Sequence, residues 1–307
     1  MNKSNLSGHT IAQIIIAGCG HIGRKVLTEI ISRKTLSAKK IITLVNTKQS
    51  QEFCLQQEVE SISINLDAPA FIMKDIVKNT DTLLYYFIAP PRKGIIDSRA
   101  EQFIEQLKQN QSYSPVKIVL ISTTGVYGNC QGKWVDEEYP LNPQVDRARR
   151  RVDAEQQFQS YCQRFNVPLV ILRVSGIYSS EKLPLKRIRS NTPIVCQTDS
   201  PYSNRIHSND LVEICIEAGI NNKITGIFNC ADGHPTTMYD YFIKVAQANH
   251  LPEPITISLH KARSQLSAGM LSYMDESRRI NNKKLLENFN LKLQYPYLKL
   301  ENLKADY

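Results

Sequence analysis

The chain has 307 residues, of which 42% are hydrophobic and 22% charged. This length suits one large α/β unit with a smaller appended region, and the composition is that of an ordinary globular protein, which argues against a fibrous or wholly disordered chain. A formal charge of +9 raises the question of nucleic-acid binding. Because the Lys and Arg residues are mostly dispersed, we expect attraction of small anions and no nucleic-acid partner.

Membrane, secreted and metal-dependent classes find little support. The longest apolar runs, 11–17 and 83–91, are much shorter than the roughly 20 residues of a membrane-spanning helix. The polar N-terminal segment does not resemble a signal peptide, so we expect a cytoplasmic protein with no membrane partner. Seven cysteines without a CxxC pair and six histidines without an HExxH motif predict reduced thiols and no metal site.

Short runs rich in β-branched residues alternate with helical patterns through most of the chain. The predicted strands cover Ile11–Ala17, Lys40–Val45, Ser61–Leu66, Thr82–Ala89, Val116–Ser122, Val167–Val174 and Gly226–Cys230. The predicted helices cover Arg24–Ser32, Asp97–Gln109, Asp146–Phe165 and Leu211–Ala218. This alternation predicts an α/β fold of the Rossmann type, with a doubly wound parallel sheet. We expect a Rossmann domain over 10–178, completed by 206–248, and a smaller substrate-binding region from 179–205 and 249–307.

A glycine-rich turn directly follows the first predicted strand. It reads Gly18-Cys19-Gly20-His21-Ile22-Gly23, a GxGxxG motif that opens a helix. In such a turn the first glycine permits a tight bend, the second lets the backbone approach a pyrophosphate, and the third allows close packing of helix on strand. The motif predicts dinucleotide binding by these residues; an S-adenosylmethionine loop is an alternative, although its third glycine more often comes two residues after the second.

The end of the second predicted strand bears on the choice between NAD and NADP. An NAD-selective site usually carries an acidic residue there, and this chain has Asn46, followed two residues later by Lys48. No carboxylate at this point would repel a 2′-phosphate, and Lys48 could pair with one, so NADP(H) is favoured over NAD(H). Ala89 and Pro90, at the end of the fourth predicted strand, are further candidates for cofactor binding.

Four segments, taken in their order along the chain, carry a family resemblance. They are Ser122–Gly128 (STTGVYG), Arg173–Tyr178 (RVSGIY), Arg205–Leu211 (RIHSNDL) and Phe228–Asp232 (FNCAD). Together with the glycine turn they resemble the extended short-chain dehydrogenases/reductases of the nucleotide-sugar epimerase and dehydratase type, over roughly residues 11 to 245. The resemblance implies an NAD(P) cofactor and a small substrate such as a sugar nucleotide.

The resemblance also implies roles for single residues and shows one departure. Thr123 stands where the family has the Ser or Thr that hydrogen-bonds the reacting carbonyl or hydroxyl. The family's YxxxK tyrosine and lysine are replaced by Arg147 and Arg151. An arginine cannot exchange a proton at neutral pH, but two guanidinium groups on one helix face could bind an anion or stabilise an alkoxide. Arg151 is also a candidate for contact with the cofactor, as is Thr123.

An intact glycine turn with the tyrosine replaced in an Arg-rich stretch resembles the atypical branch of the family typified by bacterial YeeZ-like proteins. Three hypotheses follow. The protein is an oxidoreductase or epimerase whose acid/base is another group, with Tyr127, Tyr178 and His207 as candidates; or it binds the cofactor without turnover, as a sensor or scaffold; or the loop binds S-adenosylmethionine. An enzyme needs a titratable group within hydrogen-bond reach of the substrate, whereas a sensor does not.

The substrate-side region contributes a cluster of basic residues. Its members are Lys182, Lys186, Arg187 and Arg189, which could meet an anionic ligand or form an exposed helix face. Ser277–Asn282 resembles a junction found in the atypical branch, and no mechanism attaches to it. Family members often dimerise through the helix that carries YxxxK, which implies a homodimer, although the like charges of 147–151 would repel across a twofold axis unless paired with Asp146, Asp153 or Glu155.

Overall fold

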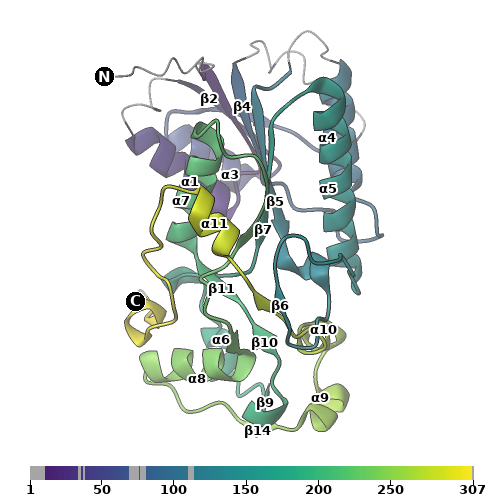
Figure 1. The fold of residues 1–307 in the computed structure, drawn as a ribbon. Helices are drawn as coiled ribbons and strands as arrows, with labels where there is room; N and C mark the ends of the chain where they lie inside the picture. Colours follow the sequence, from purple (N-terminus) through teal and green to yellow (C-terminus); the bar gives the residue numbers. More distant parts are fainter. Residues whose placement is uncertain are drawn as a thin grey trace, which may run out of the picture. The chain divides into compact units, whose positions relative to one another are not determined.

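A seven-stranded sheet organises the computed structural model, which describes residues 11–33, 36, 39–68, 76, 81–109 and 114–305. The strand order is β12-β7-β5-β4-β1-β2-β3 (Figure 1). The strands are β1 (Gln13–Ala17), β2 (Lys40–Val45), β3 (Glu60–Ser63), β4 (Thr82–Tyr86), β5 (Lys117–Thr123), β7 (Leu169–Val174) and β12 (Gly226–Cys230). β1 pairs in parallel with β2 and β4, β2 with β3, and β4 with β5. The predicted doubly wound α/β fold is confirmed.

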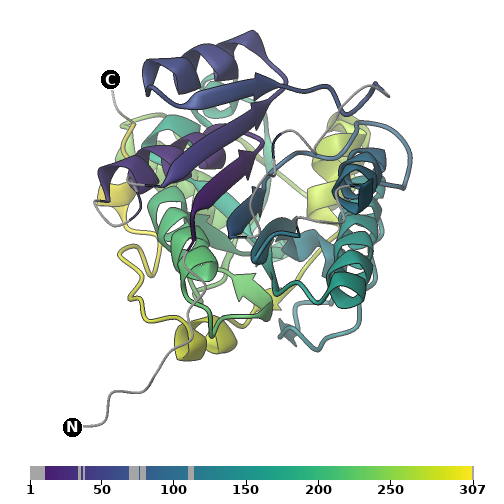
Figure 2. The same cartoon turned by 90° about the horizontal axis from the view of Figure 1, so that it is seen from above.

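Helices cover both faces of this sheet, as Figures 1 and 2 show. The helices are α1 (His21–Ser32), α3 (Lys48–Gln56), α4 (Ser98–Gln109), α5 (Asp146–Phe165) and α7 (Ser208–Ile220). Successive residues of β4 point to opposite faces: Tyr85 packs against Gly219 of α7, and Tyr86 packs against Phe103 of α4 and Phe158 of α5. Phe103 of α4 and Phe158 of α5 thus lie on the faces that these two helices bury against the sheet, as the helical spacing of their apolar residues predicted.

The observed elements differ from the predicted ones at their ends and in one helix. The predicted fourth strand ran to Ala89, but β4 ends at Tyr86 and leaves Phe87–Ala89 as a loop. Helix α3 was not predicted, because its mean hydropathy is low and Cys54 is its one fully buried residue. Its N-cap is Thr47, whose hydroxyl accepts the amide of Ser50. A capping signal alone therefore marked this helix.

The chain divides into two compact units, the first comprising 1–122, 149–172 and 212–227, and the second 123–148, 173–211 and 228–307. This division follows compactness, and the predicted Rossmann and substrate-side boundaries stay a prediction.

Further elements are β6 (Trp134–Val135), β8 (Gly176–Tyr178), α6 (Leu185–Arg189), β9 (Ile194–Val195), β10 (Tyr202–Ser203), β11 (Arg205–His207), β13 (Thr236–Thr237), α8 (Met238–Ala248), β14 (Thr256–Ile257), α9 (Leu259–Gln265), α10 (Ala268–Met274), β15 (Arg279–Ile280) and α11 (Lys283–Asn288).

The second unit is built from short paired strands around α8. Two-residue and three-residue pairs join β8 with β11, β9 with β14, β10 with β13 and β6 with β15. Helix α8 begins with a capping box, in which Thr237 and Asp240 satisfy each other's backbone amides. Its buried face packs against Tyr178, Ile188 and Leu303. No helix in the described part of the chain is long and apolar enough to cross a membrane.

Candidate cofactor and substrate sites

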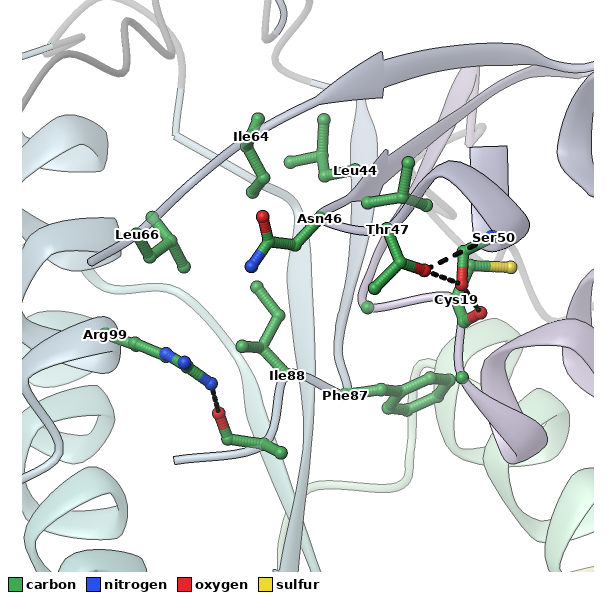
Figure 3. A pocket seen from close by; sticks show the side chains of 14 residues that line it. Cys19, Leu44, Asn46, Thr47, Ser50, Ile64, Leu66, Phe87, Ile88 and Arg99 are labelled. Atoms are coloured by element: carbon green, nitrogen blue, oxygen red, sulfur yellow. Dashed lines mark hydrogen bonds between the residues drawn. The ribbon is translucent and has the colours of Figure 1, made fainter. Parts of the chain in front are cut away.

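A cavity of about 300 Å³ lies in the first unit at the carboxyl ends of β1, β2, β3 and β4 (Figure 3). The strands on either side of β1 are β2 and β4, so this is the point where the strand order reverses. Open α/β sheets bind their ligands in the crevice at such a point. The lining residues are Gly18, Cys19, Gly20, Leu44, Val45, Asn46, Thr47, Ser50, Ile64, Leu66, Phe87, Ile88, Ala89 and Arg99.

The three glycines of the turn have different surroundings. Gly18 has a φ of +96°, and a Cβ there would lie 2.8 Å from the backbone nitrogen of Ile88. A Cβ on Gly23 would collide with the carbonyl oxygen of Gly18. Beside Gly20, in contrast, no atom of the described residues other than its chain neighbours lies within 4 Å of the position of a Cβ. The fold itself needs Gly18 and Gly23, whereas the open space beside Gly20 fits a phosphate group of a dinucleotide.

The first turn of α1 presents its backbone amides without a competing side chain. Gly20 is the N-cap, no side chain caps the helix, and its first turn holds no acidic residue. His21 and Ile22 do not line the cavity, and the side chain of Ile22 is buried in the core. If they bind the cofactor, they do so through their amides, at the positive end of the helix dipole.

A small polar network holds the glycine turn against α3. The carbonyl oxygen of Cys19 accepts hydrogen bonds from Nε of Arg24 at 3.3 Å and from the Ser50 hydroxyl at 3.1 Å. Nη2 of Arg24 also donates to Ser50 Oγ at 3.2 Å. Thr47, the N-cap of α3, donates to the same Ser50 hydroxyl at 3.0 Å. The carbonyl oxygen of Cys19 thus has two side-chain hydrogen-bond donors, which fix the conformation of the glycine turn.

Of the two residues predicted to choose between NAD and NADP, Asn46 lines the cavity and Lys48 does not. Asn46 is exposed and lines the cavity. Lys48 is the first residue of α3, its side chain is 89% exposed, and it lies 3.8 Å from Glu52 instead of lining the cavity. Among the described lining residues none is acidic. Pro90 also lies outside the lining, whereas Ala89 belongs to it.

Arg99 is a cavity residue that sequence reasoning missed. It projects from α4, and Figure 3 shows its guanidinium group donating to the carbonyl oxygen of Ala89, at 3.0 Å. Its Nε and Nη2 bind both carboxylate oxygens of Asp67, at 2.7 and 2.5 Å. The hydrogen bonds from Arg99 lower the pKa of Asp67, so the pair stays charged at neutral pH. Arg99 belongs to no sequence motif and lies in α4, well beyond the end of β4, so nothing in the sequence signalled its place at the cavity.

Arg151 is half-buried and bound to backbone. Its Nη1 donates to the carbonyl oxygens of Ile88 at 3.3 Å and Ile121 at 3.2 Å, and burial lowers its pKa. Ile88 lines the cavity, so Arg151 supports the cavity wall from behind. Nearby, the Ser122 hydroxyl donates to Glu155 at 2.5 Å. The predicted direct contact between Arg151 and the cofactor stays a prediction, but its two carbonyl partners give it a positioning role.

A second cavity, of about 330 Å³, lies within the second unit. Its lining comes from segments that are far apart in the sequence: Thr123, Thr124, Ser175, Gly176, Ile177, Tyr202, Ser203, Asn204, Arg205, Met238, Tyr273, Glu276 and Arg278. Thr123 ends β5, and its hydroxyl oxygen accepts the amide of Gly125 at 3.1 Å. The hydroxyl hydrogen of Thr123 can still donate to a ligand oxygen. The structure thus places the predicted catalytic Thr123 at a cavity.

Arg147, at the family's tyrosine position, contacts residues of α10. Its Nη1 donates to the Ser272 hydroxyl at 2.7 Å, and its guanidinium group lies 4.2 Å above the ring of Tyr273. Both partners belong to α10, and Arg147 does not line the second cavity. Arg147 and Arg151 thus bind different protein partners, and the anion-binding role of the pair stays a prediction.

Tyr127 is a structural residue and not the accessible acid that we expected. It is fully buried, its hydroxyl donates to Asn229 Oδ1 at 2.8 Å, and it accepts from Nη1 of Arg173 at 2.9 Å. Burial raises its pKa to about 12. The backbone amide of Asn229 donates to Glu137, which extends the network. Both hydrogen-bonding directions of the hydroxyl are used inside the core, so this group cannot reach a substrate.

Tyr178 and His207 are also buried and absent from the cavity lining. The two rings contact edge to face, and His207 stacks on Tyr295 with ring centroids 3.6 Å apart. Nδ1 of His207 accepts the amide of Asn209 at 3.3 Å, and burial raises the pKa of Tyr178. Asp210, three residues further along the chain, accepts the amides of Gln294 and Tyr295. These contacts argue against both as the acid/base.

The predicted basic cluster does not converge on a cavity. Lys182, Lys186 and Arg189 are exposed, and Arg187 packs over the ring of Phe242 at 4.7 Å. None of the four lines the two cavities described above. The exposed-face interpretation of this cluster fits the structure better than an anion site.

Two arginines outside that cluster and one glutamate line the second cavity. Nη1 of Arg278 binds Glu276 Oε2 at 2.8 Å and the carbonyl oxygen of Gly128 at 2.7 Å. Arg205 lies 4.2 Å above the ring of Tyr241, and its Nη1 donates to the carbonyl oxygen of Asn204. Glu276 is 6% exposed, and its Oε1 has no hydrogen-bond partner among the described residues. Glu276 adjoins the Ser277–Asn282 junction, but only the fold reveals that it reaches the cavity.

Residues 14–231 match the NAD dependent epimerase/dehydratase family. The matched segment begins in β1 and ends just after β12, so it spans the whole seven-stranded sheet. The chain belongs to the NAD-dependent epimerase/dehydratase family. The predicted family and the NAD(P) class of cofactor are thereby confirmed, whereas the resemblance to the YeeZ-like branch stays a prediction.

Solved structures share the fold along nearly the whole chain. A conserved protein of unknown function from Silicibacter pomeroyi has a TM-score of 0.73 at 24% identity, over 93% of this chain and 95% of that one. UDP-glucuronic acid 4-epimerase from Bacillus cereus, solved with NAD, has a TM-score of 0.74 at 15% identity, over 96% and 97%. UDP-glucose 4-epimerase from Thermotoga maritima, solved with UDP-glucose, has 0.74 at 16%, over 95% and 96%.

A curated relative matches a shorter stretch. Human dTDP-D-glucose 4,6-dehydratase is 36% identical over 72 residues, which cover 24% of this chain and 21% of that protein. The chain thus aligns with about a fifth of the length of this relative, and the likeness is local.

Proposed function

We propose that the protein is an NAD(P)-dependent oxidoreductase or epimerase that acts on a small anionic substrate, such as a sugar nucleotide. The observation that carries the proposal is the cavity at the reversal of the strand order, with open space beside Gly20 and an uncapped helix N-terminus. The nucleotide sugars bound or named for the structural relatives support the same class of substrate for this chain.

The cofactor would bind in the first-unit cavity, with its phosphates beside Gly20 and the first amides of α1. Asn46 would face the adenosine ribose, and the absence of an acidic side chain among the described lining residues favours NADP(H). When bound, the nicotinamide supplies hydride transfer. Gly18 and Ala89 line the cavity walls, and Gly23 lets α1 pack closely against the carbonyl group of Gly18.

The substrate would bind in the second-unit cavity. Arg205 and Arg278 give this cavity its positive charge, and guanidinium groups recognise phosphate or carboxylate groups in a fixed geometry. Ser175 and Asn204 add polar atoms to the lining. The proposal of an anionic substrate therefore rests on these two arginines and no longer on the basic cluster of 182–189.

Glu276 is our candidate for the proton transfer that the family assigns to a tyrosine. Among the cavity's described lining residues it is the one carboxylate, and its Oε1 accepts no hydrogen bond from any described residue. Arg278 binds the other oxygen, Oε2, at 2.8 Å and holds the carboxylate in place. Glu276 would take the proton of the substrate hydroxyl while Thr123 donates a hydrogen bond to the same oxygen.

Titration with NADPH and NADH by fluorescence tests the cofactor site. Gly20→Asp places a carboxylate in the open space, and we expect affinity for both nucleotides to fall about 100-fold or more, with an unchanged melting temperature. Gly269→Asp is the matched control, because its Cβ also meets no atom within 4 Å. If the unmodified protein binds neither nucleotide, the proposal is wrong.

Oxidation of bound NADPH with a panel of nucleotide sugars and carbonyl compounds separates the enzyme from the second candidate function, a cofactor-binding sensor. The sensor is favoured by Arg147, which stands at the tyrosine position and binds α10. For the enzyme, Glu276→Gln should lower turnover about 100-fold while nucleotide affinity stays the same. Tight binding without turnover across the panel would support the sensor.

Assembly and location stay parts of this proposal. A homodimer follows from the family resemblance alone. A cytoplasmic location is supported by the cysteines, all of which are free thiols in the structure, because reducing compartments keep thiols unpaired.

A further inference from the structure

Two cysteines of the first unit lie in contact at the cofactor cavity. The sulfur atoms of Cys19 and Cys54 are 3.4 Å apart, and both residues are buried. Cys19 is the central residue between Gly18 and Gly20 and lines the cavity, as Figure 3 shows. Cys54 belongs to α3, whose N-terminal residues line the same cavity. The two thiols thus join the phosphate-binding turn to the neighbouring helix.

We propose that Cys19 and Cys54 form a reversible disulfide under peroxide, and that this disulfide lowers the affinity of the cavity for its dinucleotide. The second part rests on the proposed function, whereas the first part does not. The sulfur atoms must approach by about 1.4 Å to reach the roughly 2.05 Å of a disulfide. Contact of the two side chains before oxidation means that only a small local movement is needed.

The surroundings of the pair favour a thiolate. The hydrogen bond between the sulfurs lowers the pKa of Cys54 to about 6, and it raises the pKa of Cys19. The pair therefore loses one of its two protons more readily than an ordinary thiol does. The remaining proton is then shared between the two sulfur atoms. The positive charge of Arg24 acts in the same direction on both sulfurs. A thiolate is the form that attacks a peroxide.

The oxidation balances with hydrogen peroxide as the oxidant. One sulfur attacks a peroxide oxygen, the O–O bond breaks, hydroxide leaves, and a sulfenic acid forms. Cys54, whose pKa is lowered, supplies the attacking thiolate, and Cys19 is the member of the pair that lines the cavity. The sulfur of Cys19 then attacks this sulfenic sulfur, the S–S bond forms, and the S–O bond breaks. The two thiol protons convert the two leaving oxygens to water, so two thiols and one peroxide give one disulfide and two waters.

Movement of Cys19 would disturb the cradle of the phosphates. Its carbonyl oxygen accepts from Arg24 and Ser50, and its neighbour Gly18 fits closely against Ile88. A turn held this tightly cannot shift its central residue without changing the direction of the amides that follow. Bound dinucleotide, in turn, would cover Cys19 and slow its oxidation.

Non-reducing peptide mapping by mass spectrometry tests the disulfide on the full-length protein. After treatment with hydrogen peroxide, we expect a linked Cys19–Cys54 peptide pair that dithiothreitol removes. Cys54→Ser should lose the linked pair, and Cys162→Ser should keep it, because Cys162 is a buried thiol of α5 outside this contact. If Cys54→Ser does not fold, Cys19→Ala serves the same purpose. Absence of the linked pair in folded, oxidised protein overturns the proposal.

NADPH and NADH titrations before and after oxidation test the consequence. We expect the dissociation constant to rise about 10-fold or more and to recover with dithiothreitol, a size typical of coupling between linked sites. In Cys54→Ser it should not respond to peroxide. A disulfide that leaves affinity unchanged overturns the coupling. Failure of the reduced protein to bind either nucleotide contradicts the proposed function instead, and peptide mapping still decides whether the disulfide forms.

Discussion

The two cavities of the molecule are built in different ways. The first-unit cavity takes most of its lining from the carboxyl ends of β1, β2, β3 and β4, beside predicted strands, and only Ser50 of α3 and Arg99 of α4 come from helices. The second-unit cavity gathers residues near 123, 176, 204, 238 and 276, which belong to short and irregular elements. A regular sheet turns strand ends into a site by geometry alone, whereas an irregular unit does so only through its particular contacts.

The arginines at the family's tyrosine and lysine positions show the same contrast on a single helix. Arg151 holds the carbonyl oxygens of Ile88 and Ile121 beside the strands of the sheet, while Arg147 binds the irregular α10 through Ser272. Their spacing of four residues predicted a shared face. The partners of each side chain, and with them its role, depend on what packs against that part of the helix.

The largest expected effect is a loss of stability when the core beneath the regular sheet of the first unit is disrupted. Phe158 is fully buried against Tyr86 in the sheet, so Phe158→Ala should lower the free energy of unfolding by about 3–5 kcal/mol. Gln159→Ala, at an exposed position of the same helix, should change it by less than about 0.5 kcal/mol. Urea denaturation measures both, and equal effects would contradict the predicted core.

Asp232 in the second unit gives a pH-dependent effect. Burial raises its pKa to about 7 from the ordinary 3.8, so the folded state keeps a proton that the unfolded chain releases. This group should therefore lower the stability of the fold as pH rises from about 4 to about 7, by up to about 4 kcal/mol in total. Denaturation of the protein and of Asp232→Asn at pH 5 and pH 8 measures it. Parallel pH profiles of the two proteins would contradict it.

Tyr127 should affect stability and not the cofactor. Tyr127→Phe removes the hydroxyl between Asn229 and Arg173 and should lower the free energy of unfolding by about 1–3 kcal/mol. Affinity for NADPH and NADH should stay within about twofold, because Tyr127 does not line the cofactor cavity. Tyr202→Phe, at an exposed ring of the second unit, is the control for stability. A loss of turnover without a loss of stability would restore the catalytic hypothesis for Tyr127.

Lys48 gives the smallest expected effect. Its side chain is largely exposed, so Lys48→Ala should lower the preference for NADPH over NADH by no more than about fivefold. Fluorescence titration of both nucleotides in low salt measures the ratio. Lys25→Ala, a substitution on neighbouring α1, is the control for net charge. A loss of NADPH affinity far above fivefold would show that Lys48 moves onto the 2′-phosphate.

The sequence alone determined the sheet, the glycine turn and the family resemblance. These features depend on local patterns. Apolar residues that recur every two or 3.6 positions indicate the buried face of a strand or a helix. A glycine is favoured where φ is positive, as at Gly18. The helix Asp146–Phe165 and the strand Gly226–Cys230 agree with their predicted bounds. The motif also placed Gly20 and Asn46 at the cavity before any contact was known.

Only the tertiary structure decided what the polar side chains do. It buried Tyr127 and Tyr178, turned Arg147 toward α10, and brought Glu276 and Arg278 to a cavity with Thr123. It also placed Cys54 against Cys19 across 35 positions of sequence. A hydroxyl, guanidinium or thiol has the same intrinsic chemistry everywhere in the chain. Its reach and its charge are set by partners that are distant in sequence, and no local pattern encodes those partners.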